Sequence, residues 1–127
     1  ASNAAYEDLM ADICRDLRES IDLALAARIP AGRILVDPGI GFAKTPGQNL
    51  HVMRRLAELK SLGYPILLGI SRKSFIGEVL DRQPRERIWG TAASLALGIA
   101  GGANLVRVHD VEEMVQVTRM TDAIRRG

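Results

Sequence analysis

The strongest constraint on this chain is a set of three short apolar segments, at residues 33–37, 64–70 and 104–109, separated by longer segments. Each is too short for a buried helix and ends in glycine, proline or charged residues, which predicts a buried strand followed by a loop. Strands that alternate with helices form parallel sheets through right-handed crossovers. The three loops are therefore expected at one edge of a small parallel sheet.

The segments between the strands have helical periodicity. Pro30 ends the first of them, Gly63 closes the second in the position of a left-handed cap, and Asp110 with Glu113 resembles a capping box at the start of the last. The predicted helices cover residues 6–28, 49–62, 75–80 and 84–100, followed by one after Asp110.

Three parallel strands are few for an independent α/β domain. A doubly wound sheet has about five strands and a β/α barrel has eight, so the sequence predicts part of a larger barrel or sheet. In isolation the strands would leave two open edges and an uncovered apolar inner face, expected around Ile34, Val36, Leu67 and Val106. Residues 1–4 look like the remnant of a purification tag, so the predicted domain covers residues 5–127.

Composition narrows the functional class. The chain has 127 residues with 17 Lys and Arg against 15 Asp and Glu, and no basic run exceeds two residues, so nucleic acid is not an expected partner. Charged residues interrupt every apolar stretch, which argues against membrane insertion. The single cysteine, Cys14, lies in a helical segment and is expected to be a small core residue. These features together favour a reduced, cytoplasmic protein.

The three loops concentrate the polar residues that could carry chemistry. Asp37 is either a turn former or a carboxylate that accepts paired hydrogen bonds from a ligand. Arg107 and His109 are two residues apart on a strand and point to the same face, where they would meet either an internal ion-pair partner or an anionic substrate. A phosphate-binding P-loop that includes Lys44 would need glycine at Pro38 and Ala43. A dinucleotide-binding fingerprint that starts at Gly39 would need its third glycine at Lys44. The sequence therefore argues against nucleotide binding of either kind.

Three strand-end motifs, in this order and spacing, resemble those of dihydropteroate synthase: Asp37-Pro38-Gly39-Ile40-Gly41-Phe42, Ser71-Arg72-Lys73-Ser74 and Arg107-Val108-His109-Asp110. That family folds as a TIM (β/α)8 barrel. It condenses 6-hydroxymethyl-7,8-dihydropterin pyrophosphate with para-aminobenzoate in folate synthesis and is the sulfonamide target. The resemblance implies the C-terminal part of the barrel, with three parallel strands and flanking helices, as the fold class.

The resemblance also implies a role for each matching residue. Lys73, Arg107 and His109 would be catalytic, with Arg107 and His109 holding pyrophosphate and Arg107 also packing over the pterin. Asp37 would accept hydrogen bonds from the pterin ring, and Lys73 would contact the pterin beside the aminobenzoate pocket. The remaining substrate-binding positions would be Gly69 beneath the pterin, Phe42 against the aminobenzoate ring and Ser74 at its carboxylate.

Other parts of the family's site have no counterpart in the chain. The first strands, with the asparagine that holds Mg²⁺, are missing, so Mg²⁺ is implied as a cofactor without a metal ligand here. The isolated chain is expected to be inactive and to form a homo-oligomer or to bind an N-terminal complement. Two alternatives remain, a barrel fragment that acts only by self-association and a pterin-binding methyltransferase, although the Ser71-to-Ser74 loop favours the synthase.

Overall fold

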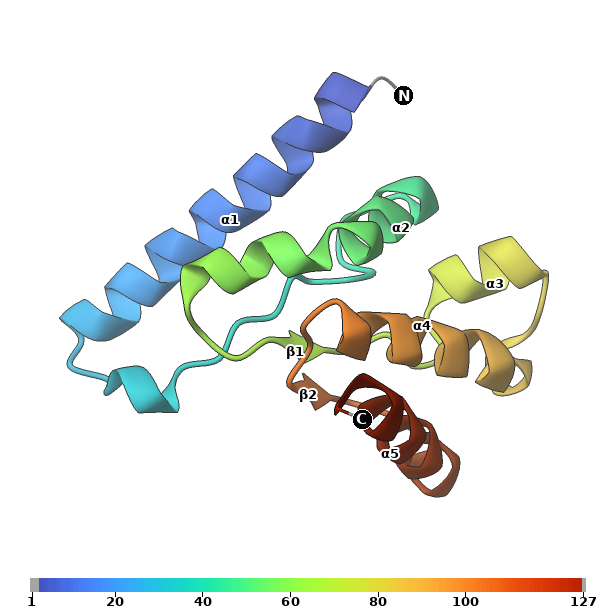
Figure 1. Ribbon diagram of the computed structural model, residues 1–127. Helices are drawn as coiled ribbons and strands as arrows, with labels where there is room; N and C mark the ends of the chain where they lie inside the picture. Colours follow the sequence, from blue (N-terminus) through green and yellow to red (C-terminus); the bar gives the residue numbers. More distant parts are fainter. Residues whose placement is uncertain (1–2, 127) are drawn as a thin grey trace.

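The computed structural model describes residues 3–126 (Figure 1). Of the expected tag remnant, Ala1 and Ser2 lie outside the described residues, whereas Asn3 and Ala4 belong to the first turn of α1. The elements are α1 (Asn3–Ala26), η1 (Ala31–Arg33), α2 (Pro46–Arg54), η2 (Leu56–Leu62), β1 (Leu67–Leu68), α3 (Ser74–Leu80), η3 (Pro84–Glu86), α4 (Ile88–Ala100), β2 (Leu105–Val106) and α5 (Val111–Arg126), where η marks a 3₁₀ helix.

The three apolar segments do lie side by side in parallel. β1 pairs with β2 in the register Leu67 to Leu105, and Val36 forms a parallel bridge with Ile66 on the other side of β1. The regular strands are shorter than predicted. The expected strand at 33–37 is reduced to the bridge at Val36, because η1 winds residues 31–33 into a turn before the chain becomes extended.

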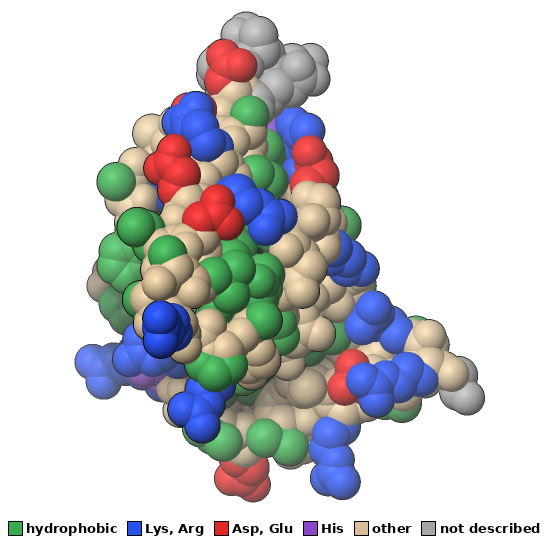
Figure 2. All heavy atoms as spheres, turned by 90° about the vertical axis from the view of Figure 1, so that its left-hand side faces the viewer, with side chains coloured by type: hydrophobic (Ala, Val, Ile, Leu, Met, Phe, Trp, Pro, Cys, Tyr) green, Lys and Arg blue, Asp and Glu red, His purple; other side chains and the backbone are tan. Residues whose placement is uncertain are grey.

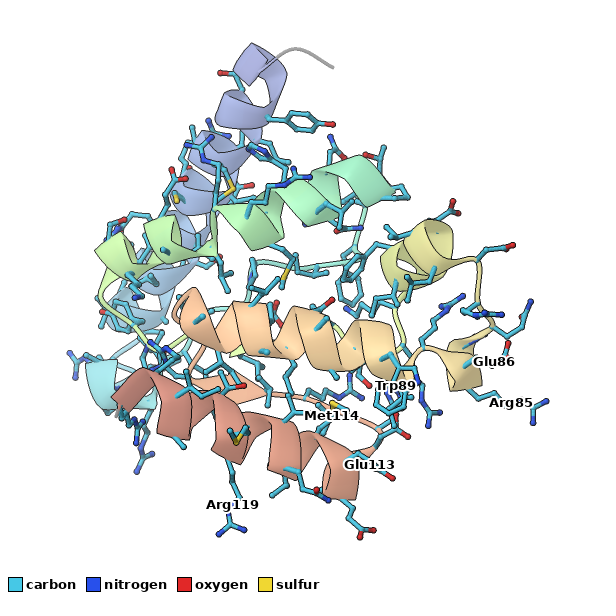
Figure 3. The ribbon with its side chains drawn as sticks, turned by 45° about the vertical axis from the view of Figure 1, so that its right-hand side comes forward. Arg85, Glu86, Trp89, Glu113, Met114 and Arg119 are labelled. Carbon is cyan, nitrogen blue, oxygen red and sulfur yellow. The ribbon has the colours of Figure 1, made fainter. Side chains whose placement is uncertain are left out.

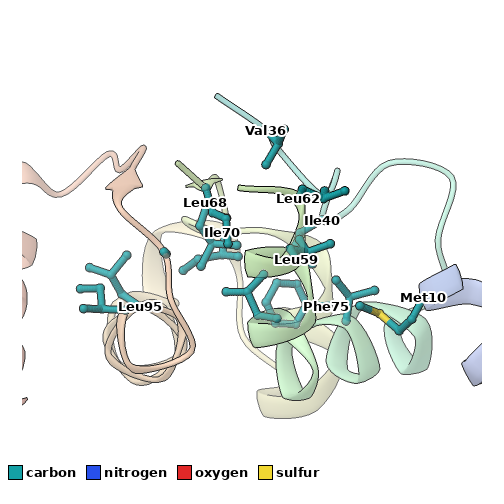
Figure 4. Close-up of a cluster of buried hydrophobic side chains, with 14 of the residues drawn as sticks. Met10, Val36, Ile40, Leu59, Leu62, Leu68, Ile70, Phe75 and Leu95 are labelled. Carbon is teal, nitrogen blue, oxygen red and sulfur yellow. The ribbon is translucent and has the colours of Figure 1, made fainter. Parts of the chain in front are cut away.

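One face of this small sheet is covered by helices. The even-numbered residues Val36, Ile66, Leu68 and Ile70 are at most 4% exposed and form the centre of the core. Side chains from η2, α3 and α4 pack beneath them, as Figure 4 shows for Leu59, Phe75 and Leu95. The sheet and its helices therefore form two layers.

The opposite face of the sheet is bare, and the predicted composition of that face was largely wrong. Val36 is buried beneath the helices, and Ile34 and Val106 also pack against the helical core. Only Leu67 was assigned to the correct face; its neighbours there are Leu35 and Leu105, each 44% exposed. Successive side chains along a strand point to opposite faces of the sheet. An assignment that is wrong by one residue therefore places the buried side chains on the bare face and the exposed ones in the core.

This leucine face predicts association of the isolated chain. Leu35, Leu67 and Leu105 form one apolar strip beside unpaired strand edges, and both features favour pairing with another polypeptide. We expect sedimentation at micromolar concentration to show dimers or larger species, and Leu105→Lys to shift the population toward monomer. A cooperatively melting monomer in the wild-type chain would contradict this prediction.

The helices also depart from their predicted bounds. The second starts at Pro46 rather than at residue 49, because Thr45 and Gln48 form a reciprocal capping box, and it breaks at Arg55 into η2. Gly63 closes η2 with φ 83°, as predicted. The fourth predicted helix is divided into η3 and α4 by Arg87.

The outer helices carry mixed charges on their exposed sides. Figure 2 shows acidic and basic side chains interspersed over α1, where Arg15 pairs with Asp12 at 3.1 Å. Cys14 on the same helix is half-buried against the core, and burial together with Glu58 raises the pKa of its thiol. This agrees with the expected core role. No helix within residues 3–126 is long and apolar enough to span a membrane.

Helices α4 and α5 pack along each other next to β2 (Figure 3). Met114 points between them and is 2% exposed, whereas Arg119 points away from the core. The capping box predicted at the start of α5 is not formed as expected. The Asp110 carboxylate accepts hydrogen bonds from Arg72 instead of closing the helix end with Glu113.

Candidate functional site

A hollow of about 330 Å³ lies where the three strands end, within the size range typical of small-molecule sites. Six of the seven residues predicted to bind substrate line it: Asp37, Phe42, Gly69, Lys73, Arg107 and His109. The carboxylate comes from the first strand end, and Arg107 and His109 come from the third. The hollow therefore combines one acidic side chain with several basic ones.

The loop after the first strand has an unusual backbone. Gly39, Gly41 and Ala43 have φ values of 73°, 87° and 52°, so alternate residues are left-handed. Asp37 Oδ1 accepts a hydrogen bond from the Gly39 N–H at 2.8 Å, and buried Asn49 accepts one from the Gly41 N–H at 2.8 Å. The loop is thus fixed both by its own first residue and by α2.

Two lysines hold the same loop through its carbonyl oxygens. Lys44 Nζ donates to Gly39 O at 2.8 Å and to Phe42 O at 3.3 Å. Lys73, from the second loop, donates to Ile40 O, and its Nζ lies 4.4 Å from the centre of the Phe42 ring, within cation–π range. These contacts place the ammonium group of Lys73 between the first and second loops.

Burial is the main cause of a lowered pKa at both lysines. Burial lowers the pKa of Lys73, and the nearby charges of Arg107 and Lys44 lower it further, whereas Asp37 opposes the change. Burial likewise lowers the pKa of Lys44, again opposed by Asp37. An excess of positive charge around one carboxylate is typical of a site that accepts an anionic ligand.

The second loop is held by residues that the sequence analysis did not select. Arg72 has φ 56°; its N–H donates to buried Thr91 Oγ1 at 3.1 Å, and its carbonyl accepts from Arg87 at 2.8 Å. Its guanidinium pairs with Asp110 at 2.8 Å, and this hydrogen bond lowers the pKa of the carboxyl. Charged side chains thus tie the second loop to the third.

His109 is held by Ser71. Ser71 is 6% exposed, and its hydroxyl oxygen lies 3.1 Å from the backbone nitrogen of His109 and 2.8 Å from its Nδ1. Arg107, by contrast, uses only its backbone, whose N–H donates to Leu68 O at 3.0 Å; its guanidinium makes no hydrogen bond or ion pair within the described chain. An internal salt bridge, the alternative left open for Arg107, is therefore not formed among residues 3–126.

Two predicted residues have distinct placements. Gly69 lines the hollow, and a Cβ added to it would meet nothing within 4 Å, so a ligand could approach the backbone there. Ser74, the first residue of α3, is exposed and does not line this hollow. Ser71 was missed as a site residue, although its two-residue spacing from Gly69 and Leu67 places all three on the same face.

A parallel sheet with a ligand-sized hollow at its strand ends is typical of α/β proteins that bind small molecules. The comparison with protein families shows which of them this chain resembles. Residues 1–109 match the model of the pterin binding enzymes, and the chain belongs to that family. Within it, the chain is 50% identical to the dihydropteroate synthase of Synechocystis over 95% of its own length and 42% of that protein, and 50% identical to that of Bacillus subtilis over 94% and 42%. The resemblance inferred from the three motifs is confirmed.

Solved structures give the same result. The chain matches dihydropteroate synthase from Clostridium difficile, determined with pteroic acid, at a TM-score of 0.91 and 50% identity over 94% of this chain and 45% of that one. A Yersinia pestis dihydropteroate synthase with a sulfonamide drug matches at a TM-score of 0.91 and 37% identity, over 93% and 43%. The chain thus spans less than half the length of these relatives.

The described residues do not fit the Mg²⁺ implied by the resemblance. No three His, Cys, Asp or Glu side chains among residues 3–126 lie together as a metal-binding group. The only carboxylate that lines the hollow is Asp37, and the other charged groups there are cations.

Proposed function

We propose that this chain forms the C-terminal part of a TIM (β/α)8 barrel of a dihydropteroate synthase and carries much of its pterin and anion site. The observation that carries the proposal is the convergence of Asp37, Lys73, Arg107 and His109 on one hollow, from three strand ends far apart in sequence. The bare leucine face supports the barrel, because in a closed barrel that face lies in the packed interior.

The proposed reaction is a substitution at the methylene carbon of 6-hydroxymethyl-7,8-dihydropterin pyrophosphate. The amine nitrogen of para-aminobenzoate forms the new C–N bond, the C–O bond to the diphosphate breaks, and the amine loses a proton. Negative charge grows on the departing pyrophosphate, so the cations of Arg107 and Lys73 and a donor from His109 stabilise the transition state more than the ground state.

The remaining residues of the site would bind the pterin and the para-aminobenzoate. The Asp37 oxygen that is free of the Gly39 N–H would accept from the pterin ring and its amino group, and open space above Gly69 would admit the ring. Phe42, 68% exposed beside Lys73, would pack against the aminobenzoate ring. Ser74 would bind the carboxylate of that substrate from the start of α3, outside the hollow that the other residues line.

The whole protein would supply what this chain lacks. We propose that the Mg²⁺ ligand lies on a segment that precedes this chain, that the protein is cytoplasmic, and that the isolated chain forms a homo-oligomer or binds an N-terminal complement through the leucine face.

The direct test is an assay of both forms of the protein. The full-length protein that contains this chain should release pyrophosphate when given the pterin pyrophosphate and para-aminobenzoate together, and the 127-residue chain alone should not. Methyl transfer without pyrophosphate release would favour the methyltransferase alternative. Absence of both activities, with retained self-association, would favour the non-enzymatic one.

A further inference from the structure

Ser71 is a buried polar residue of the hollow that has no role in the reaction proposed above. It follows β1, and its only hydrogen-bond partner among residues 3–126 is His109, which follows β2. Both contacts join the same two residues, one through the backbone N–H of His109 and one through Nδ1 of its ring. The side chain of Ser71 therefore determines how the imidazole is presented to the hollow.

Counting donors and acceptors gives the direction of the second contact. A serine hydroxyl has one proton to donate and two positions at which to accept. The backbone N–H of His109 can only donate, so it occupies one acceptor position. The hydroxyl proton then needs an acceptor, and Nδ1 at 2.8 Å is the one within reach in the described chain.

The reverse arrangement satisfies fewer groups. If Nδ1 carried the proton and donated it to Ser71, the hydroxyl would accept twice and its own proton would have no partner. Ser71 is only 6% exposed, and buried polar hydrogens without acceptors are rare. A neutral imidazole that accepts at Nδ1 carries its proton on Nε2.

We propose that Ser71 is a positioning residue that donates to Nδ1 of neutral His109 and so keeps the ring proton on Nε2, where it can be donated to an oxygen of a phosphate-type anion beside Arg107. The anion rests on the proposed function, whereas the tautomer rests only on the contacts of Ser71. An imidazole with the opposite tautomer would present a lone pair to the anion instead of a proton.

The second histidine of the chain provides an internal contrast. Nε2 of His51 lies 3.4 Å from a guanidinium nitrogen of Arg55, and arginine has no acceptor, so this ring nitrogen must accept. The proton of neutral His51 is therefore expected on Nδ1. The two histidines should have opposite tautomers in the same molecule.

The test is ¹⁵N NMR of the ring nitrogens in the 127-residue chain, at about pH 8.5, well above the reference pKa of histidine. We expect His109 to be protonated on Nε2 and His51 on Nδ1. Ser71→Ala should move the His109 resonances toward a mixture of tautomers and leave those of His51 unchanged, and Ser71→Thr should restore the wild-type pattern. Ser61→Ala, which removes a hydroxyl bonded only to Glu58 O, is the matched control.

Titration with inorganic pyrophosphate tests the anion site separately from the tautomer of His109. In the wild-type chain it should shift the His109 resonances, with an affinity that falls about two- to tenfold in Ser71→Ala, as expected for one neutral hydrogen bond. A proton on Nδ1 of wild-type His109, or an unchanged tautomer in Ser71→Ala, would overturn the inference. The expected tautomers without any response to pyrophosphate would uphold the role of Ser71 and contradict the proposed anion site.

Discussion

Arg107→Gln in the full-length protein should lower turnover about 100- to 1,000-fold, the range seen when one group that stabilises developing negative charge is removed. The affinity for pyrophosphate should fall with it, because the same guanidinium binds the product. The guanidinium of Arg107 makes no hydrogen bond or ion pair within residues 3–126, so its loss leaves no unpaired carboxylate behind in this part of the chain. The melting temperature should therefore stay close to that of the wild type.

The measurement compares steady-state pyrophosphate release, pyrophosphate binding and thermal melting. Arg85→Gln is the matched control, because Arg85 lies on η3 and points away from the rest of the molecule (Figure 3). It should leave all three quantities unchanged. If Arg107→Gln instead lowered the melting temperature and kept full activity, Arg107 would be a structural residue and the anion site would lie elsewhere.

Asp37→Asn should weaken binding of a pterin about 10- to 100-fold, since hydrogen bonds to charged groups contribute about 1.5–3 kcal/mol. The substitution should change the contact with the pterin and leave the local backbone as it is. Oδ1 of an asparagine can still accept from the Gly39 N–H, so the turn that Asp37 makes is retained. The second oxygen, however, becomes an NH₂ group that faces the N–H donors of the ligand.

Calorimetry with the full-length protein measures this change directly. Asp22→Asn, on the exposed side of α1, removes the same charge far from the hollow and is expected to bind the pterin as the wild type does. Unchanged pterin affinity in Asp37→Asn would return Asp37 to the alternative role of a turn residue. Removal of the carboxylate should also lower the pKa of Lys73 further, because Asp37 is the charge that opposes its depression.

The order of elements was predictable because periodicity is a local property. Apolar positions three and four apart defined α1 and α4, and the run around Leu68 defined a buried strand. Helix bounds were less predictable, since Pro46 reads as a helix breaker until the capping box of Thr45 with Gln48 places it in the first turn.

The side chains of the site were predictable only where they carry a motif. Asp37 and Lys73 were selected because they stand at strand ends within motifs that resemble those of dihydropteroate synthase. Asn49, Thr91 and Arg87 hold the loops from helical segments or their ends, and nothing in their local sequence indicates which loop they contact. The face of each strand was also hard to assign, because an apolar residue such as Val36 fits either side of a sheet.

The backbone of residues 39–44 has a consequence for how tightly a ligand could be held. Its left-handed residues are held by hydrogen bonds to Lys44, Asn49 and Lys73, all of which are made within the chain itself. The conformational entropy of this segment is therefore lost when the chain folds, and not when a ligand arrives. Such preorganisation leaves more of the contact free energy available as affinity.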